Sequence, residues 1–370
     1  MFLAWKELKQ NKAKYGLILM ILVLIIFLVL FLTGLTKGLA AASSSAIDNS
    51  AANYYILEDS SDNLLSRSSV SKEDIEIIKD FSKDSEEINL HIANIFSKAD
   101  DSSKLNISYL GINPSSFLMP EVIEGNTLVN KNELVLDSSF KDEGFEIGDI
   151  ITDSTSEVEM TVVGFTKNQV YNYAPIGVIS IETYSDIIKA STILKEVNSQ
   201  GIALKIDDNE QTVKDLEDFI NNNIEDKMLI TKSTLINNLP GYSAQQGTLV
   251  TMLVFLFAIS SLIIAVFFYV TTMQKIPQFG VLKALGAKMS TLAISLASQV
   301  FVLAFASAII GNILTFISAS FLPNSMPFIL NYMDAILVSL LFLVISVGSS
   351  LFSIKKVKKV DAVSAIGGTY

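Results

Sequence analysis

The chain has 370 residues, of which 50% are hydrophobic and 18% are charged, an apolar excess that an ordinary soluble protein does not carry. Residues 40–245 hold 35 acidic and 15 basic side chains, a net charge of −20, whereas the flanks carry +9. This division excludes a uniform acidic globule, and it argues against nucleic-acid binding because the bases are not gathered on the polar segment. With no cysteine and one histidine, His91, the chain excludes thiolate catalysis, disulfides and histidine-rich metal sites.

Four long apolar runs predict transmembrane helices. They are expected at 16–39, 246–272, 291–322 and 335–354. The first run is longer than the apolar core of about 7 to 15 residues in a signal peptide, so we interpret it as a spanning helix. Gly311 and Asn312, in the middle of the third run, indicate either a bend or a helix-packing contact.

Lysines mark three ends of these spans. They lie before the first span, between the second and third, and after the fourth: Lys6, Lys9, Lys12, Lys14; Lys275, Lys283, Lys288; Lys355, Lys356, Lys358, Lys359. By the positive-inside rule all three clusters are cytoplasmic. The sequence therefore predicts a multi-pass protein of the cell membrane with both termini cytoplasmic, the segment 40–245 outside, and a short second outer loop at 323–334.

The two ends of the chain have their own patterns. Residues 1–15 place Phe2, Trp5 and Leu8 near one helical face, which predicts an amphipathic helix lying in the inner membrane interface with Trp5 as its anchor. The alternative is a plain lead-in to the first span. Residues 355–370 are expected to form a basic cytoplasmic tail.

The segment 40–245 is long enough for its own core and mixes strand and helix patterns. Strands are expected at 53–57, 88–96, 105–112, 133–136, 158–165, 176–181 and 202–206, and helices at 71–80, 182–190 and 208–223. Ser43-Ser44-Ser45 and Leu239-Pro240-Gly241 are expected to be its hinges. The predicted fold class is an α-helical membrane protein with four transmembrane helices and an inserted α+β extracytoplasmic domain between the first and second.

No catalytic constellation is visible in this acidic domain. Asp100-Asp101 and Asp207-Asp208 can be read as metal or acid–base pairs, but neither has the spacing of a calcium loop, so solvated surface is the favoured interpretation. His91 alternates within a strand pattern and is interpreted as a packing or surface residue. The net charge is expected to keep the domain soluble and away from anionic headgroups.

The most specific motif lies in the cytoplasmic loop expected at 273–290. Residues 274–287 read QKIPQFGVLKALGA, which resembles the loop of the FtsX-like and macrolide-exporter-like (type VII) ABC transporter permeases, Arg-x-x-Glu-Ile-Gly-Ile-Leu-Lys-Ala-Ile-Gly-Ala. The matching residues are Gly280, Leu282, Lys283, Ala284 and Gly286. Lys275 stands where an arginine is frequent, and Gln278 replaces the usual acid. The loop predicts a short helix that ends at Gly286 and docks in a partner; an ordinary connector is the alternative.

Within that family the chain is most similar to the haem-exporting permeases of Gram-positive bacteria. The similarity lies in residues 1–7 (MFLAWKE), 267–276 (FFYVTTMQKI) and 360–368 (VDAVSAIGG), although Ala362 and Ser364 depart from the subgroup's common Pro and Glu. The resemblance implies a permease homodimer with two copies of a separate ABC ATPase, which binds ATP and Mg²⁺ and contacts Lys275 and the matching loop residues. It also implies that strokes of this ATPase move the outside domains and expel cargo, a mechanotransmission mechanism.

No Walker A pattern occurs in the chain. We therefore expect a permease subunit that is not an enzyme and has no intrinsic cofactor, with membrane lipid as its surroundings. Haem is the cargo that the subgroup implies. Export of antimicrobial peptides or other amphiphiles is one alternative, and a non-transporting mechanotransmitter that regulates a cell-wall hydrolase is another.

Haem cargo makes Tyr242 a candidate iron ligand, because tyrosinate ligates haem iron and the subgroup has a tyrosine at this place. Its alternative role is that of an interfacial belt residue. No other metal site is expected.

The end of the first span supplies further candidate cargo contacts, Phe31, Gly34, Leu35 and Lys37. Gly34 and Gly38 are four residues apart and allow close approach, in a dimer seam or a cargo cleft; a lipid-facing helix is the alternative. Lys37 is expected either to pair with a haem propionate or to extend toward lipid headgroups.

Overall fold

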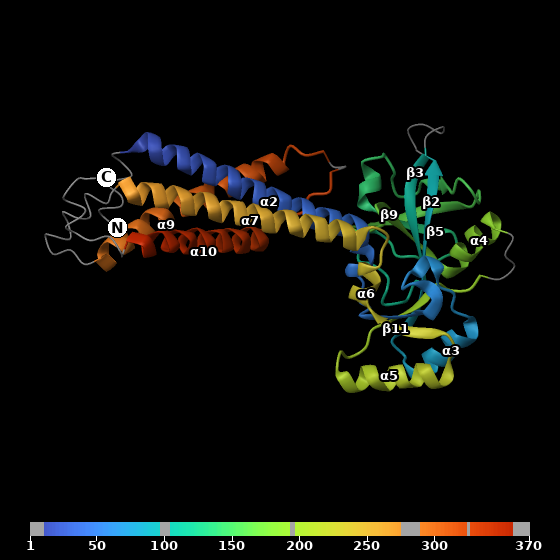
Figure 1. Cartoon of the computed structure of the whole chain (residues 1–370). Helices are drawn as coiled ribbons and strands as arrows, with labels where there is room; N and C mark the ends of the chain where they lie inside the picture. The colour runs from blue at the N-terminus through green and yellow to red at the C-terminus, as the bar shows by residue number, and fades with distance from the viewer. Residues whose placement is uncertain (1–10, 97–103, 193–196, 275–288, 324–325, 358–370) are drawn as a thin grey trace, which may run out of the picture. The chain divides into compact units, whose positions relative to one another are not determined.

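The computed structural model describes residues 11–96, 104–192, 197–274, 289–323 and 326–357 (Figure 1). The chain divides into two compact units. The helical unit consists of Met1–Leu39 and Gln246–Tyr370, and the sheet unit consists of Ala40–Gln245. Trp5, the coupling loop from 275 to 288 and the tail from 358 onward lie outside the described residues.

Within the described residues, four helices are long and apolar enough to cross a membrane. They are α2 (Lys12–Asp48), α7 (Tyr242–Gln274), α9 (Met289–Ala319) and α10 (Tyr332–Val357). The sheet unit is inserted between the first and second of them, which confirms the predicted fold class. α9 is one uninterrupted helix through Gly311 and Asn312.

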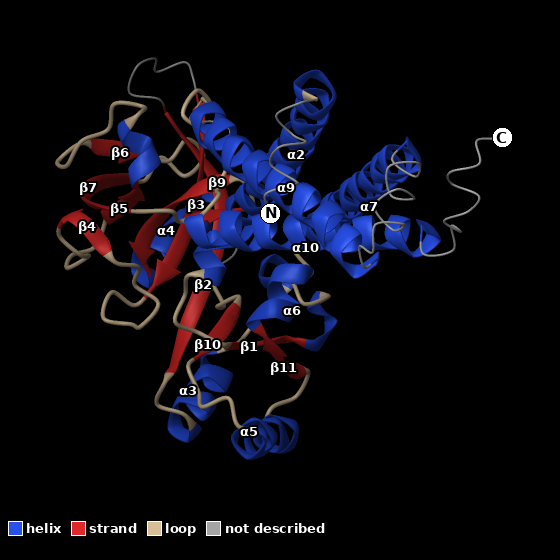
Figure 2. Cartoon of the chain, turned by 90° about the vertical axis from the view of Figure 1, so that its left-hand side faces the viewer, coloured by secondary structure: helices blue, strands red, loops and turns tan. Residues whose placement is uncertain are grey.

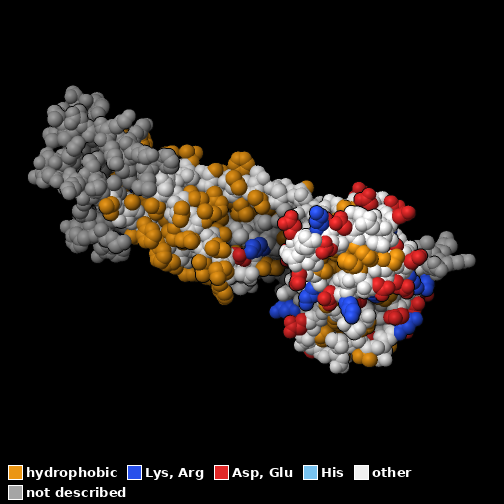
Figure 3. Space-filling model, turned by 90° about the horizontal axis from the view of Figure 1, so that it is seen from below, with side chains coloured by type: hydrophobic (Ala, Val, Ile, Leu, Met, Phe, Trp, Pro, Cys, Tyr) orange, Lys and Arg blue, Asp and Glu red, His pale blue; other side chains and the backbone are white. Residues whose placement is uncertain are grey.

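One face of α2 holds the helical unit together. Buried residues recur on it every three or four positions, as a single helix face requires: Tyr15, Ile18, Leu22, Ile26 and Leu30. They pack with Phe268 of α7, Val300 of α9 and Phe342 of α10. Leu17, Leu24 and many other apolar side chains of the unit are instead exposed, and orange side chains cover much of its surface in Figure 3. Such a surface suits contact with lipid.

Some polar side chains within these helices are paired across neighbouring helices, whereas others, such as Ser260 and Ser346, donate to a carbonyl of their own helix. The buried Tyr15 hydroxyl donates to Gln299 Oε1 at 3.1 Å. Asn312 Nδ2 donates to Ser339 Oγ of α10 at 2.8 Å, so the packing role predicted for Asn312 is confirmed. Such bonds satisfy groups that hydrocarbon leaves without partners.

The sheet unit contains one mixed sheet of eleven described strands (Figure 2). The strands are β1 (Tyr54–Glu58), β2 (Ser85–Phe96), β3 (Lys104–Ile112), β4 (Val122–Gly125), β5 (Glu133–Asp137), β6 (Ile150–Thr152), β7 (Glu159–Thr166), β8 (Val170–Tyr171), β9 (Ala174–Ser180), β10 (Gly201–Leu204) and β11 (Lys227–Thr231). Their order is β11-β1-β10-β2-β3-β9-β5-β7-β4, with β6 paired to β7 and β8 to β9. Most neighbours are antiparallel, while β3–β9 and β5–β7 are parallel.

In the described part of this unit, four α-helices accompany the sheet: α3 (Lys72–Phe81), α4 (Ile181–Ser191), α5 (Glu210–Asn223) and α6 (Lys232–Asn237). The same residues include three short 3₁₀ helices, at Asp59–Ser61, Leu65–Arg67 and Ser138–Lys141. Alternation along β1 assigns its faces, because Ile56 packs with α3 and α5 whereas Tyr55 and Leu57 enter a second core cluster. Ser71 opens α3 with a reciprocal capping box involving Asp74.

Every strand and helix expected in this unit is present, with ends shifted by a few residues. The prediction omitted β4, β6, β8, β11 and α6. These elements are two to six residues long, and three of the four residues of β4 are exposed, so they carry no clear apolar period.

The hinge expected at Ser43-Ser44-Ser45 is wrong. These serines are buried within α2, which continues to Asp48. The amide of Val170 donates to Ser45 Oγ at 2.9 Å, and the amide of Tyr173 donates to the Ala42 carbonyl at 2.8 Å. Small side chains let the segment around β8 approach the helix backbone closely. The second expected hinge is a turn between α6 and α7, in which Gly241 has a φ of 76°.

Substitution of Gly311 tests the packing of α2 against α9. A Cβ at Gly311 would overlap the Ile26 side chain. We expect Gly311→Ala to lower the free energy of unfolding of the helical unit by about 1–3 kcal/mol, measured as a lower melting temperature of the purified permease. Gly348→Ala in α10 is the matched control, because no atom lies within 4 Å of the added methyl group. Equal melting temperatures for the two variants would contradict this packing.

Candidate functional site

The candidate site in the helical unit lies where α2 meets the chain segment that leads into α10. We call this the α2 cluster; it consists of Phe31, Gly34, Lys37 and Gly38 of α2 together with Pro327, Phe328, Ile329 and Asp334. Leu35 is half-buried on the same helix. The cluster contains three of the four residues that the sequence proposes as cargo contacts in the first span.

The two glycines of the α2 cluster are covered closely. The Phe328 ring lies against Gly34, and the Pro327 backbone lies against Gly38, so neither position has room for a Cβ. Phe31 adds a second ring, with its centroid 5.3 Å from that of Phe328. The glycines therefore form a shallow seat on α2 into which an aromatic ring fits.

Polar contacts complete the α2 cluster. The Ile329 amide donates to the Gly34 carbonyl at 3.0 Å. Lys37 Nζ lies 2.6 Å from Asp334 Oδ1, and 47% of the lysine side chain and 16% of the aspartate side chain are exposed. Asp334 is in the first turn of α10, where the helix dipole favours an acid. Its second oxygen, Oδ2, is buried and has no hydrogen-bond partner among the described residues.

These contacts give Gly34, Gly38 and Lys37 partners within the chain, and they do not test the roles predicted for these residues. The close approach at Gly34 and Gly38 is made here by a segment of the same chain. Lys37 pairs with Asp334, a partner that the sequence analysis did not consider. The dimer seam, the cargo cleft and the propionate contact stay predictions.

Asp334 and Phe328 are the residues that the sequence analysis missed. A signal for Asp334 was available, because it is one of three acids outside 40–245 and Lys37 is the one lysine of the flanks that belongs to none of the cytoplasmic clusters. Isolated opposite charges near the ends of apolar spans are expected to pair. Phe328 gives no comparable signal among so many apolar residues.

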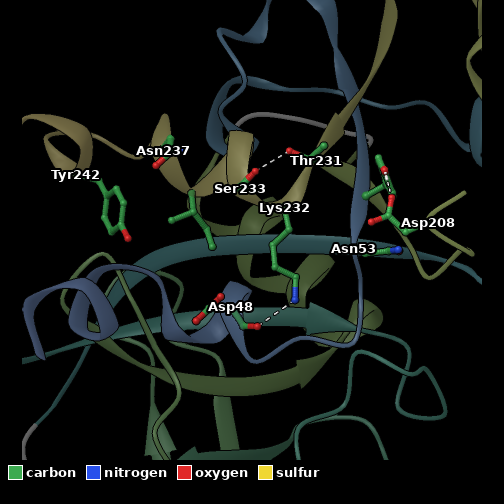
Figure 4. A pocket seen from close by; sticks show the side chains of 10 residues that line it. Asp48, Asn53, Asp208, Thr231, Lys232, Ser233, Asn237 and Tyr242 are labelled. Atoms are coloured by element: carbon green, nitrogen blue, oxygen red, sulfur yellow. Dashed lines mark hydrogen bonds between the residues drawn. The ribbon is translucent and has the colours of Figure 1, made fainter. Parts of the chain in front are cut away.

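Tyr242 belongs to the sheet unit. It lines a cavity of about 550 Å³ (Figure 4). The lining residues are Asp48, Asn53, Tyr54, Asp208, Thr231, Lys232, Ser233, Ile236, Asn237 and Tyr242. The half-buried Tyr242 ring packs on the core cluster around Ile236 and Leu239. Tyr242 is thus one of the polar residues that line the cavity.

Lys232 serves the structure of this cavity. Its ammonium donates to the carbonyl oxygens of Asp48 at 3.0 Å and Ser50 at 2.7 Å, at the C-terminal end of α2. A cation at that end of a helix is favourable. Burial lowers the pKa of Lys232, and the charge of Asp48 opposes this shift. The lysine is thus committed to the helix end.

Among the described residues, the remaining candidates form no metal or acid–base site. Asp208 accepts a hydrogen bond from Tyr54, Asp100-Asp101 lies outside the described residues, and the described residues hold no acidic or histidine cluster fit for a metal. Burial lowers the pKa of His91, with Asp153 opposing the shift, and His91 lies opposite Tyr109 in the β2–β3 pair. The coupling residues Lys275, Gly280, Leu282, Lys283, Ala284 and Gly286 are outside the described residues.

Comparison with known families decides the class of protein. The family described as MacB-like periplasmic core domain matches residues 16–219, and the family described as FtsX-like permease C-terminal matches residues 250–362. The chain belongs to the FtsX-like ABC permeases with a MacB-like periplasmic core domain. It is thus the transmembrane subunit of an ABC transporter, which is not itself an enzyme and works with an ATPase partner. It is a membrane protein whose sheet unit is extracellular.

Relatives match this FtsX-like permease over its full length. It is 28% identical over 370 residues to the "Putative hemin transport system permease protein HrtB" of Staphylococcus haemolyticus, covering 100% of this chain and 99% of the relative. A protein of the same name from Staphylococcus epidermidis is 28% identical over 372 residues, with the same coverage.

Solved structures of outside domains are also similar. The periplasmic region of MacB from Actinobacillus actinomycetemcomitans is 14% identical, with a TM-score of 0.36, and the match covers 50% of this chain and 90% of that one. The extracellular domain of the transporter YknZ from Gram-positive bacteria gives the same identity and TM-score, covering 48% and 100%.

Alkaline titration tests the hydrogen bond between Tyr54 and Asp208, two residues that line the Tyr242 cavity. The Tyr54 hydroxyl donates to Asp208 Oδ1 at 2.6 Å, and this bond, with burial and negative charge, raises the pKa of Tyr54 to about 12 from 10.0. Because the folded-state pKa is the higher one, the bond stabilises the domain fully below pH 10 and this contribution is lost as the pH approaches 12.

The absorbance of ionised tyrosine is measured against pH for wild type and Tyr54→Phe. The difference between the two curves reports Tyr54 alone and should have its midpoint near pH 12. Asp208→Asn is the control and should move this midpoint down toward 10, since it removes the carboxylate acceptor and its charge. A wild-type midpoint already near 10 would contradict the bond.

Proposed function

We propose that this permease exports haem from the membrane, using ATP hydrolysed by a separate ATPase. The observation that carries the proposal is the match over the whole length to relatives named as hemin transport permeases. The α2 cluster supports this proposal, since it combines a glycine seat into which an aromatic ring fits with a cation, Lys37.

The chemistry of haem fits the residues that the chain offers. Haem is a flat apolar ring with carboxylates at one edge and ferric iron at its centre. Phe31, Gly34 and Leu35 supply apolar contact for the ring, and Lys37 supplies a charge-assisted hydrogen bond for a carboxylate. Tyr242 supplies a phenolate to the iron, which stabilises the deprotonated form.

Force is proposed to enter from the cytoplasmic side. Two permeases and two ATPase subunits form the assembly, with both permease termini cytoplasmic. The ATPase contacts the loop residues Lys275, Gly280, Leu282, Lys283, Ala284 and Gly286, the helix anchored by Trp5, and the basic tail. Binding and hydrolysis of ATP shift the spans between two arrangements, and the outside domains follow. α2 and α7 are single long helices, Lys12–Asp48 and Tyr242–Gln274, which supports transmission along them.

Spectroscopic titration with ferric haem tests the cargo and the ligand together. The purified permease–ATPase complex should bind haem saturably. Tyr242→Phe should lose the tyrosinate spectrum and bind about tenfold more weakly or worse, since a metal ligand has been removed. Tyr269→Phe, on the same helix, is the matched control and should keep both properties.

The outcomes separate the two parts of this proposal. An unchanged spectrum in Tyr242→Phe removes that residue from the site and leaves haem as cargo. Absence of saturable wild-type binding, together with growth on toxic haem that is unaffected by gene deletion, removes haem as the cargo. Stimulation of ATP hydrolysis by cationic peptides would then favour peptide export.

A further inference from the structure

The segment that covers Gly34 and Gly38 has the two chemical features of the proposed cargo. Phe328 presents a flat apolar ring to the glycine seat, and Asp334 presents a carboxylate to Lys37. We propose that Phe328 and Asp334 act as an internal pseudo-cargo, which occupies the α2 cluster until haem displaces it. This inference rests on the proposed function and concerns the regulation of the same site.

The two glycines of α2 leave space for the ring of Phe328. Gly34 and Gly38 lie one turn apart on α2, and at both positions the covering atoms leave no room for a methyl group. The Phe328 ring lies against Gly34, and its centroid is 5.3 Å from the centroid of the Phe31 ring. A second flat ring of cargo cannot enter this seat while Phe328 is there.

Lys37 binds the carboxylate of Asp334. Lys37 is three residues from Gly34, so its side chain lies near the same face of the helix as the seat. Asp334 Oδ1 lies 2.6 Å from Lys37 Nζ. A carboxylate of the cargo would need this same contact with the lysine. Ring and carboxylate of the cargo therefore compete with Phe328 and Asp334 at the same two points.

Apolar packing and exchangeable polar contacts hold the segment, and Leu330 packs against the core of the helical unit. A backbone hydrogen bond, from the Ile329 amide to the Gly34 carbonyl at 3.0 Å, joins the segment to α2. The lysine is 47% exposed, and Asp334 Oδ2 has no partner among the described residues. A buried acceptor without a partner carries a desolvation cost, so release of Asp334 into water recovers part of what the broken ion pair loses.

Competition of this kind has a direct consequence for transport. The apparent affinity for cargo is the intrinsic affinity multiplied by the fraction of molecules whose seat is open, so it falls when Phe328 and Asp334 occupy the seat. When the spans rearrange and cargo leaves, the return of Phe328 and Asp334 refills the seat with a matching ring and charge. The segment then prevents cargo from rebinding.

Weakening the pseudo-cargo tests this proposal. Asp334→Asn and Phe328→Ala, in the full permease–ATPase complex, should each tighten haem binding severalfold in the spectroscopic titration, because the open fraction rises. A merely structural role predicts the opposite sign. Phe321→Ala is the matched control for the aromatic substitution, since Phe321 is 82% exposed, and it should leave the affinity unchanged.

A reversible lock gives a second measurement that does not depend on comparing variants. The chain has no cysteine, so Lys37→Cys with Asp334→Cys introduces one unique pair. Joining the pair with a short thiol-specific cross-linker through disulfides should abolish haem binding, and a reductant should restore it in the same molecules. The unlinked double variant fixes the reference affinity.

Each outcome has one meaning. Absence of saturable haem binding by the wild-type complex, together with growth on toxic haem that is unaffected by gene deletion, ends the proposed function, and the pseudo-cargo with it. Saturable wild-type binding that Asp334→Asn and Phe328→Ala fail to tighten, and that the lock fails to reduce, overturns the pseudo-cargo while haem export stands. Tighter binding in both variants with loss on locking supports the pseudo-cargo.

Discussion

The structure depends on the absence of hydrogen-bonding solvent in hydrocarbon. The backbone amides of the four long helices must be satisfied within their own helices, and polar side chains there find partners in their own helix backbone or in a neighbouring helix. Asn312 with Ser339, Tyr15 with Gln299 and Ser261 with Ser349 meet this demand. The same constraint leaves charge at the span ends, where Lys37 and Asp334 form their ion pair.

A second consequence concerns close packing. Where lipid supplies no hydrophobic drive between helices, small residues let the chain approach closely. Gly311 admits Ile26, while Gly34 and Gly38 admit a loop that carries an aromatic ring. The first contact is structural. The second lies beside a cation and a second ring, and this combination makes it the site to which we assign function.

Local pattern was sufficient for elements whose burial is periodic. Long apolar runs gave the four spans, and alternation gave strands such as β2 and β3. Ser43-Ser44-Ser45 was misread because its composition is typical of a linker, whereas the burial that keeps it helical comes from β8, far along the chain. The α2 residues of the α2 cluster could be predicted from the sequence, but their partners could not. Lys37 and Asp334 are 297 residues apart, and only the folded bundle brings them together.

The account requires the sheet unit to lie outside the cell and the start of α2 to lie inside. Because the chain has no cysteine, single cysteines report sidedness cleanly. Ser139→Cys in the sheet unit and Ala13→Cys at the start of α2 are both at exposed positions. An impermeant maleimide applied to intact cells should label the first and should reach the second only after permeabilisation. Labelling of Ala13→Cys but not of Ser139→Cys in intact cells would contradict the account.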